Sequence, residues 1–106
     1  MTLQIRKKRR FTRFASKQKA QYCLRERYGS WKECTIHTTS RKGVGITLKE
    51  KINVGSIIFL EIPIPHEFAP LSIKGTLRWI KEKENDFIGG IEFNKVLDEV
   101  EFSKLG

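Results

Sequence analysis

The sequence predicts an all-β fold, namely a small six-stranded antiparallel barrel with a short C-terminal helix and a flexible basic N-terminal arm. From residue 20 onward, apolar and polar residues alternate with a period of two, and turn residues interrupt this pattern at short intervals. Such a combination is typical of a sandwich or barrel. A chain of 106 residues suits one hydrophobic core, because each of two cores would be small enough to need disulfides or metals. We therefore assign residues 1–14 to the arm and residues 15–106 to one barrel domain.

The first predicted hairpin joins strands at residues 20–24 and 31–37 through a glycine-containing turn. Apolar side chains occupy alternate positions in both strands. If Leu24 pairs with Cys34 on the apolar face, the connecting turn holds an odd number of residues, such as three. Cys23 then lies on the face opposite Cys34, so the two thiols point apart and we expect no disulfide.

Three further strands are predicted at residues 43–48, 57–62 and 71–81. The loop at residues 63–70 contains all three prolines, which end strands because they cannot donate to the hydrogen-bonded ladder. The long fifth strand alternates cleanly between apolar and polar residues. Its apolar face consists of Ile73, Gly75, Leu77 and Trp79. This pattern predicts that Trp79 lies in the core.

The C-terminal part of the chain completes the barrel. Residues 81–86 are rich in charge and predict a solvated hairpin loop, which leads into a sixth strand at residues 87–93. Gly89 and Gly90 lie within that strand and indicate a bend or a close approach of another backbone. Residues 96–105 combine spaced apolar side chains with acidic ones, which predicts a short helix.

Basic residues are concentrated at the N-terminus. The chain holds 21 Lys and Arg against 12 Asp and Glu, a net charge of +9. Residues 1–27 contain ten of the basic residues and only one acidic residue, whereas the remainder contains 11 of each sign. A neutral body with a basic arm indicates a local anionic partner, such as nucleic acid, a phosphorylated small molecule or an anionic lipid. The alternative is a solvated basic tail with no partner.

Several classes of function are disfavoured by the composition. No stretch approaches the roughly 18 apolar residues of a spanning helix, and no signal peptide is evident, so we expect a cytoplasmic protein without a membrane partner. Cys23 and Cys34 are isolated, and two histidines add too few ligands for a zinc site. No nucleophile, base and orienting group can be assembled. We therefore expect no enzyme, no metal and no cofactor.

Two short motifs carry the functional prediction. The arm contains Arg9-Arg10-Phe11-Thr12-Arg13, and after 24 intervening residues the chain reads Thr38-Thr39-Ser40-Arg41-Lys42-Gly43. These segments resemble the PilZ domain, whose pattern is RxxxR followed after roughly 20 to 30 residues by [D/N]xSxxG. Thr38 departs from the pattern, because it stands where the family has Asp or Asn. The segments Gly75–Trp79 and Gly89–Phe93 also resemble the strand pair that closes the PilZ barrel.

The resemblance implies a receptor for cyclic di-GMP, a ligand with two phosphates and two guanines. Arginine suits such a ligand, because its planar fork of donors matches phosphate oxygens or a guanine edge and its flat face stacks on purines. By resemblance, two arginines of the arm hold the ligand against a wall on the barrel. The expected contacts are Arg9, Arg13, Thr38, Ser40 and Gly43, with Lys8 and Arg10 as auxiliary candidates.

Two other functions remain open from the sequence. One is a PilZ-like interaction adaptor that does not bind the nucleotide, which the departure at Thr38 favours. The other is a basic β-barrel that binds nucleic acid, although the aromatic residues fall mostly on apolar faces rather than on an exposed strand face. No output module accompanies the predicted domain, so we expect it to signal through an effector protein whose identity the sequence does not give.

Overall fold

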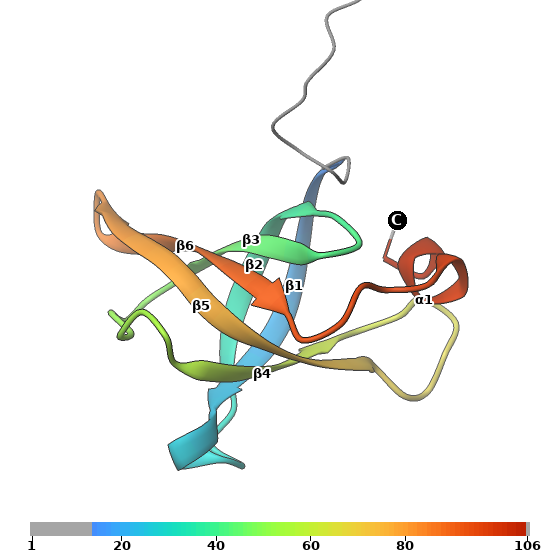
Figure 1. Cartoon of the computed structure of the whole chain (residues 1–106), viewed down its shortest axis with the longest axis horizontal. Coiled ribbons are helices and arrows are strands. Elements are labelled where there is room, and N and C mark those ends of the chain that lie inside the picture. Colours follow the sequence, from blue (N-terminus) through green and yellow to red (C-terminus); the bar gives the residue numbers. More distant parts are fainter. Residues whose placement is uncertain (1–13, 106) are drawn as a thin grey trace, which may run out of the picture.

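The computed structural model describes residues 14–105, and over this range the chain forms a closed six-stranded antiparallel barrel (Figure 1). The strands are β1 (Phe14–Leu24), β2 (Lys32–Thr39), β3 (Gly43–Leu48), β4 (Ile57–Ile62), β5 (Leu71–Lys83) and β6 (Asp86–Phe93). They follow one another around the barrel in the order β1-β2-β3-β6-β5-β4. The predicted all-β barrel is confirmed.

Alternate residues of the strands point into the barrel and form one apolar core. The most deeply buried side chains on the strands include Tyr22, Ile36, Ile46, Ile58, Leu60, Leu77 and Phe93. Each such side chain contributes about 1.5–3 kcal/mol to the stability of the folded state. Side chains fill the interior of a small barrel. A ligand therefore has to bind on the outer face or at an end.

The connection from β1 to β2 differs from the predicted turn. A single turn of 3-10 helix, η1 (Arg25–Arg27), follows β1 directly, so the connection is longer than three residues. The predicted pairing of Leu24 with Cys34 is wrong: Cys34 pairs with Ala20, and Leu24 pairs with Ile58 of β4. The last residues of β1 thus close the barrel against β4. Both cysteine thiols are free and buried.

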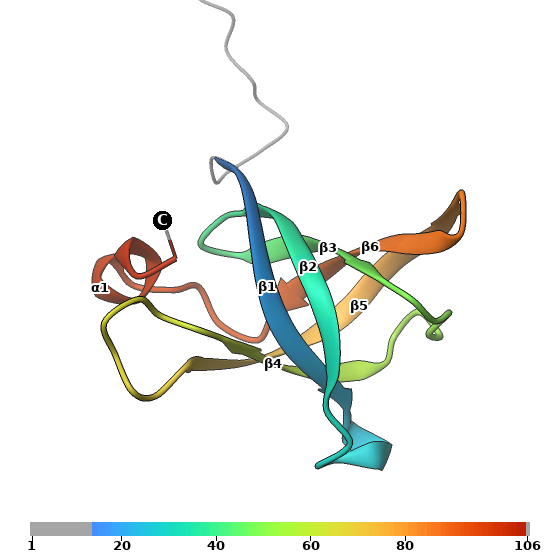
Figure 2. The same ribbon diagram turned by 180° about the vertical axis from the view of Figure 1, so that it is seen from behind.

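The hairpin of β5 and β6 is longer than predicted. Residues 81–86 are not a loop, since β5 continues to Lys83 and pairs with the first residue of β6, Asp86. Only residues 84–85 form the turn, and Glu84 has a φ of 58° there. Both faces of this end of the hairpin are exposed to solvent, so its residues are charged on either face. The sequence therefore lacks the apolar–polar alternation that indicates a strand. The hairpin projects beyond the body of the barrel, as Figures 1 and 2 show.

Trp79 lies outside the barrel, which corrects its predicted place in the core. A β-bulge shifts the register between Leu77, which pairs with Ile91, and Trp79, which pairs with Gly90. One extra residue in a strand moves every later side chain to the other face. Trp79 is therefore 45% exposed, and Ile80 packs against the core in its place.

The predicted C-terminal helix is present as α1 (Glu99–Ser103). Asp98 caps its first turn, since its side chain accepts a hydrogen bond from the Glu101 amide while the Glu101 side chain accepts from the Asp98 amide. The helix lies beside the loop between β4 and β5 (Figure 1). Lys104, directly after the helix, places its Nζ 3.5 Å from Oε1 of Glu67 in that loop. Within residues 14–105 no helix has the length and apolarity needed to cross a bilayer.

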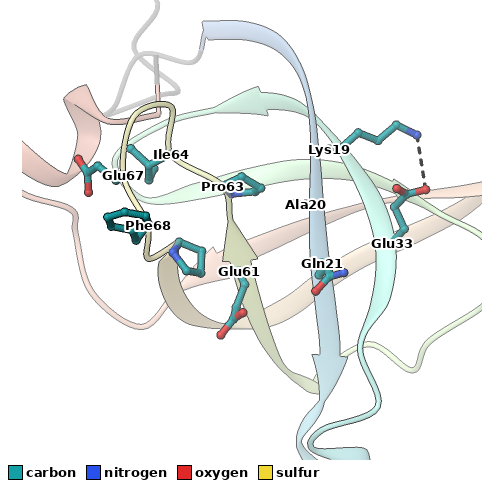
Figure 3. A pocket seen from close by; sticks show the side chains of 10 residues that line it. Lys19, Ala20, Gln21, Glu33, Glu61, Pro63, Ile64, Glu67 and Phe68 are labelled. Carbon is teal, nitrogen blue, oxygen red and sulfur yellow. Dashed lines mark ion pairs between the residues drawn. The ribbon is translucent and has the colours of Figure 1, made fainter.

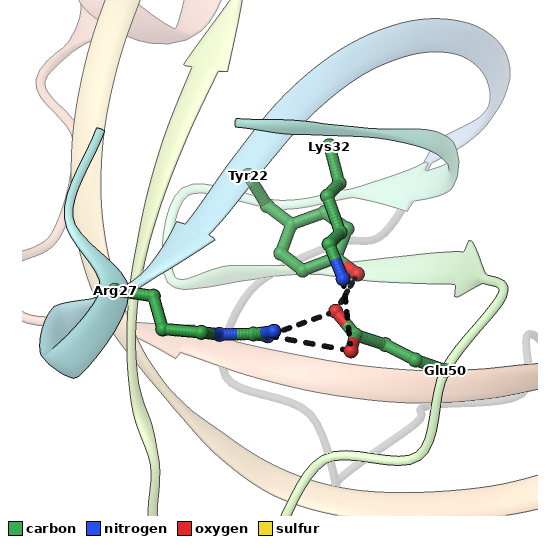
Figure 4. Close-up of polar contacts among 4 residues, drawn as sticks. All are labelled: Tyr22, Arg27, Lys32 and Glu50. Atoms are coloured by element: carbon green, nitrogen blue, oxygen red, sulfur yellow. Dashed lines mark hydrogen bonds and ion pairs between the residues drawn. The ribbon is translucent and has the colours of Figure 1, made fainter. Parts of the chain in front are cut away.

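A hydrogen bond between a buried tyrosine and a glutamate stabilises one end of the barrel (Figure 4). The Tyr22 side chain is almost fully buried, and its hydroxyl donates to Glu50. Arg27 and Lys32 place cations 3.1 and 3.3 Å from the same carboxylate. Because a buried hydroxyl without a partner is costly, Glu50 ties the segment after β3 to β1 and β2.

We expect the contribution of this contact to the free energy of unfolding to decrease at acidic pH. Burial alone would raise the pKa of Glu50, but hydrogen bonds from Tyr22, Lys32 and Arg27 outweigh it and hold the pKa below the usual value of 4.5. As the pH falls, the unfolded chain therefore takes up this proton first, and the stabilisation is lost as pH drops through the folded pKa. Glu50→Gln should cost about 1–2 kcal/mol at neutral pH and progressively less below about pH 4.5 in urea unfolding. A cost that is independent of pH would contradict this account.

Candidate functional site

The second sequence motif forms the turn between β2 and β3. The Ser40 hydroxyl accepts hydrogen bonds from the backbone amides of Lys42 and Gly43 at 3.2 and 3.1 Å and donates to the Gly43 carbonyl at 3.3 Å. The Ser40 amide also donates to that carbonyl, at 2.9 Å. Ser40 is only 3% exposed. In this structure the serine of the motif therefore shapes the turn from within.

Gly43 permits a close approach of two strands. It pairs with Glu92 of β6, and a Cβ atom at Gly43 would collide with the Ile91 carbonyl oxygen and lie 3.3 Å from the Glu92 Cα. Both contacts are with backbone, which cannot move aside as a side chain can. The glycine of the motif is therefore needed for the fold of the site, since it sets how closely β3 lies against β6.

Thr38 lies on the outer face of the barrel, above a pair of glycines. It pairs with Gly45 of β3, and its Oγ1 is 2.7 Å from the place that a Cβ of Gly45 would take. Gly45 in turn pairs with Gly90 of β6, where a Cβ would collide with the indole of Trp79. The two glycines thus leave room for Thr38 on one side and Trp79 on the other.

Two hollows lie next to each other on this face, and Trp79 lines both. We name the larger one, with a volume of about 640 Å³, the wide hollow. Its lining includes Lys17, His37, Thr38, Gly45, Trp79 and Lys83, together with the carboxylates of Glu84 and Asp86. The second, of about 230 Å³, is the narrow hollow. Its lining includes Ser40, Lys42, Arg78, Trp79, Gly90 and Glu92. The residues of the second motif therefore belong to one continuous surface with Trp79 at its centre.

The narrow hollow carries three charged side chains. Arg78 Nε donates to Glu92 Oε1 at 2.7 Å, and Lys42 Nζ lies 3.6 Å from Glu92 Oε2. The hydrogen bond and charge of Arg78, together with the charge of Lys42, hold the pKa of Glu92 below its usual value. Glu92 is therefore ionised at neutral pH, and the two cations exceed it by one positive charge, which suits an anionic ligand.

Another hollow of the described chain lies on a different side and has a different character (Figure 3). It is bounded by β1 and by the loop between β4 and β5, where Phe68 is fully exposed, and its volume is about 390 Å³. Three carboxylates line it: Glu33, Glu61 and Glu67. None of the motif residues lies there, and its acidic lining disfavours a phosphorylated ligand.

Of the predicted barrel residues, Ser40 and Gly43 line the narrow hollow, although Ser40 is buried in the turn, whereas Thr38 lines the adjoining wide hollow. Arg9, Arg13, Lys8 and Arg10 lie outside the described residues, so their predicted contacts remain predictions. Phe14, the first residue of β1, pairs with Thr39. The described chain therefore starts next to the motif turn, one residue after Arg13 in sequence.

Sequence reasoning missed several residues of this surface, among them Trp79, Arg78, Glu92, Lys42 and Lys17. The bulge in β5 hid Trp79, because alternation alone placed it in the core. A signal was nevertheless present, since Gly45, Gly89 and Gly90 are glycines inside strands, and such glycines mark places where another group approaches closely. In this barrel the groups above Gly45 and Gly90 are Thr38 and the indole of Trp79.

Comparison with known proteins identifies one domain family. The sequence profile of the PilZ domain matches residues 7–106, whereas no curated protein matches significantly. Among solved structures, the PilZ domain of YcgR from Escherichia coli with c-di-GMP is 17% identical, with a TM-score of 0.70 over 93% of this chain and 87% of that chain. The Bacillus subtilis inhibitor of motility, MotI/DgrA, is 16% identical, with a TM-score of 0.70 over 92% of this chain and 47% of that chain.

A third similar structure is the MrkH–c-di-GMP complex of K. pneumonia, at 12% identity and a TM-score of 0.66. That match covers 95% of this chain and 51% of the other. The present chain thus spans about half the length of MotI/DgrA and MrkH. At these identities the likeness to solved structures shows the fold.

Proposed function

The chain belongs to the PilZ domain family, whose profile covers all but its first six residues, and from this premise we propose that it is a receptor domain for cyclic di-GMP. In this proposal the domain signals through an effector protein and has no catalytic role. The predicted basic arm, residues 1–14, and the predicted barrel, residues 15–106, each supply one side of the binding site, with the difference that β1 already begins at Phe14.

The surface around Trp79 is the observation that carries this proposal. Trp79 offers an exposed indole between two hollows, and aromatic side chains stack on nucleobases. Lys42 and Arg78 bring positive charge to the narrow hollow and Lys17 to the wide one. A ligand that alternates guanines and phosphates fits a surface of two hollows with cations beside them.

The arm supplies the remaining charge in this arrangement. Arg9 and Arg13 match the family's RxxxR motif, and the first described strand residue after them pairs with Thr39 of the motif turn. We expect both guanidinium groups to bind the ligand from the side opposite the barrel, through charge-assisted hydrogen bonds to phosphate or guanine. Lys8 and Arg10 add attraction for the ligand without a required contact.

Structural neighbours support the ligand class. The YcgR domain and MrkH were solved with c-di-GMP, as was the PlzA protein of Borreliella burgdorferi. We place the domain in the cytoplasm, where such a nucleotide would be encountered. Within the described residues, no group of three or more His, Cys, Asp or Glu side chains could hold a metal ion, and the proposal requires none.

The proposal is tested by isothermal titration calorimetry of the full chain with cyclic di-GMP, GTP and a short RNA. We expect saturable binding of cyclic di-GMP and no comparable binding of the other two. If RNA binds as tightly as cyclic di-GMP, the domain is instead a basic β-barrel that binds nucleic acid. Binding of none of the three would place the domain among PilZ-like adaptors that do not use the nucleotide, for which the departure at Thr38 would be the first candidate cause.

Trp79→Ala should weaken cyclic di-GMP binding by about tenfold, because one stacked base contributes about 1–3 kcal/mol. The melting temperature should change little, since the side chain is 45% exposed. Tyr28→Ala is the matched control, because Tyr28 is also an exposed aromatic residue, at 68%, but lines neither hollow. If the two variants bind equally well, Trp79 is not a stacking surface.

A further inference from the structure

Glu92 is a carboxylate placed within an otherwise basic part of the candidate site. Among the described residues that line the narrow hollow, it alone is acidic. A carboxylate there opposes the binding of phosphate, so a purely electrostatic site would not contain it. Resting on the function proposed above, we propose that Glu92 recognises guanine, by accepting hydrogen bonds from the N1–H and N2–H groups of one base.

The position of Glu92 suits this task. Gly90 and Glu92 are two residues apart on β6, so they share the outward face and lie roughly 7 Å apart along the strand. The indole of Trp79 lies over Gly90. A base stacked on that indole within the narrow hollow can therefore direct its edge along the strand toward Glu92.

The existing contacts of Glu92 leave acceptor capacity for a base. Arg78 Nε occupies one site on Oε1, at 2.7 Å, while Lys42 lies 3.6 Å from Oε2, beyond the usual length of a hydrogen bond. An ionised carboxylate offers about four acceptor sites. The two cations thus keep Glu92 charged and oriented without saturating it.

Thr38 does not provide the same recognition. Its hydroxyl lies above Gly45 and lines the wide hollow, on the other side of Trp79. A hydroxyl offers a single oxygen as acceptor, whereas the Watson–Crick edge of guanine presents two neighbouring donors that match the two oxygens of a carboxylate. Adenine has an acceptor at N1, so an ionised Glu92 would repel it. The carboxylate therefore distinguishes the two purines.

Calorimetric titration with cyclic di-GMP and cyclic di-AMP tests this inference. The native chain should prefer cyclic di-GMP strongly. In Glu92→Gln the amide presents a donor to one guanine donor but can pair with both the N1 and N6 groups of adenine. We expect the preference for cyclic di-GMP to fall roughly tenfold to a hundredfold, which is the worth of one bidentate base contact.

Two control variants separate base recognition from charge. Glu61→Gln removes an equal charge from the outer face of β4, where Glu61 lines the acidic hollow of Figure 3, and should leave the preference unchanged. Arg78→Gln removes the cation beside Glu92 and should weaken both ligands while the preference for guanine remains. Thermal unfolding should show that each variant is folded, because none of the three side chains belongs to the described core.

The outcomes distinguish this inference from the proposed function. A loss of preference in Glu92→Gln alone supports the role of Glu92. Equal tightening of both ligands in Glu92→Gln would show that Glu92 is only a counter-charge, and unchanged affinities would show that it does not contact the ligand; either result overturns the inference while the receptor function stands. If the native chain binds neither ligand, the proposed function fails and the inference fails with it.

Discussion

Replacing both Arg9 and Arg13 with alanine should weaken cyclic di-GMP binding by about a hundredfold or more. In the proposed site, each substitution removes a charged, bidentate partner of the ligand, at a cost on the order of 1.5–3 kcal/mol. The melting temperature of the free protein should change little, because the sequence predicts an arm with few apolar side chains to bury. Calorimetric titration and thermal unfolding of the same samples measure both effects.

Two further variants show whether these arginines act as specific contacts. Arg6→Ala removes the same charge outside the RxxxR motif, so only a small loss through screened, long-range attraction is expected. Arg→Lys at position 9 or 13 should also weaken binding, because a point charge does not reproduce the planar fork of donors. Equal losses at Arg6, Arg9 and Arg13 would instead indicate a diffuse basic surface, as in binding to nucleic acid or lipid.

Gly43→Ala should lower the free energy of unfolding by about 3 kcal/mol, because the new methyl group would collide with the carbonyl of Ile91. The strands β3 and β6 would have to separate at the motif turn. For a domain of this size, that loss corresponds to a fall in melting temperature of roughly 12–24 °C. Urea and thermal unfolding of the variant and the native chain measure it.

Gly90→Ala is the matched comparison for Gly43→Ala. Its methyl group would collide with the indole of Trp79 rather than with backbone, and an exposed side chain can move aside. We therefore expect a small loss of stability in Gly90→Ala but weaker ligand binding, since the stacking surface is displaced. If Gly43→Ala melts like the native chain, the close approach of β3 and β6 is not essential to the fold.

The strand pattern of the sequence predicted most of the barrel. The third and fourth strands, Gly43–Leu48 and Ile57–Ile62, begin and end where predicted, because turn residues and prolines bound these two short, mainly apolar runs. Errors arose where the chain departs from strict alternation. The η1 turn lengthened the first connection, and the charged tip of the last hairpin has no apolar face from which its pairing could be inferred.

The sequence predicted only those residues of the candidate site that belong to a linear motif. Thr38, Ser40 and Gly43 follow each other in sequence, and the motif therefore located the turn that they form. Trp79 and Glu92 join that turn only through the pairing of β3, β5 and β6, and the bulge that turns Trp79 outward has no local signature. Burial also cannot be seen in a motif, so the inward position of the Ser40 side chain emerged only from the structure.

The filled interior of the barrel limits the conformational changes by which a bound nucleotide could affect a partner protein. Buried apolar side chains fill the barrel, and closely packed protein interiors have low compressibility. We therefore expect a ligand on the outer face to deform the barrel little. If the proposed site is right, signalling would not need a change in the shape of the barrel. The bound nucleotide, the Trp79 indole and the arm would instead form a new surface that the ligand-free domain lacks. An effector that responds to this domain would therefore bind this new surface through direct contacts with the nucleotide and the arm.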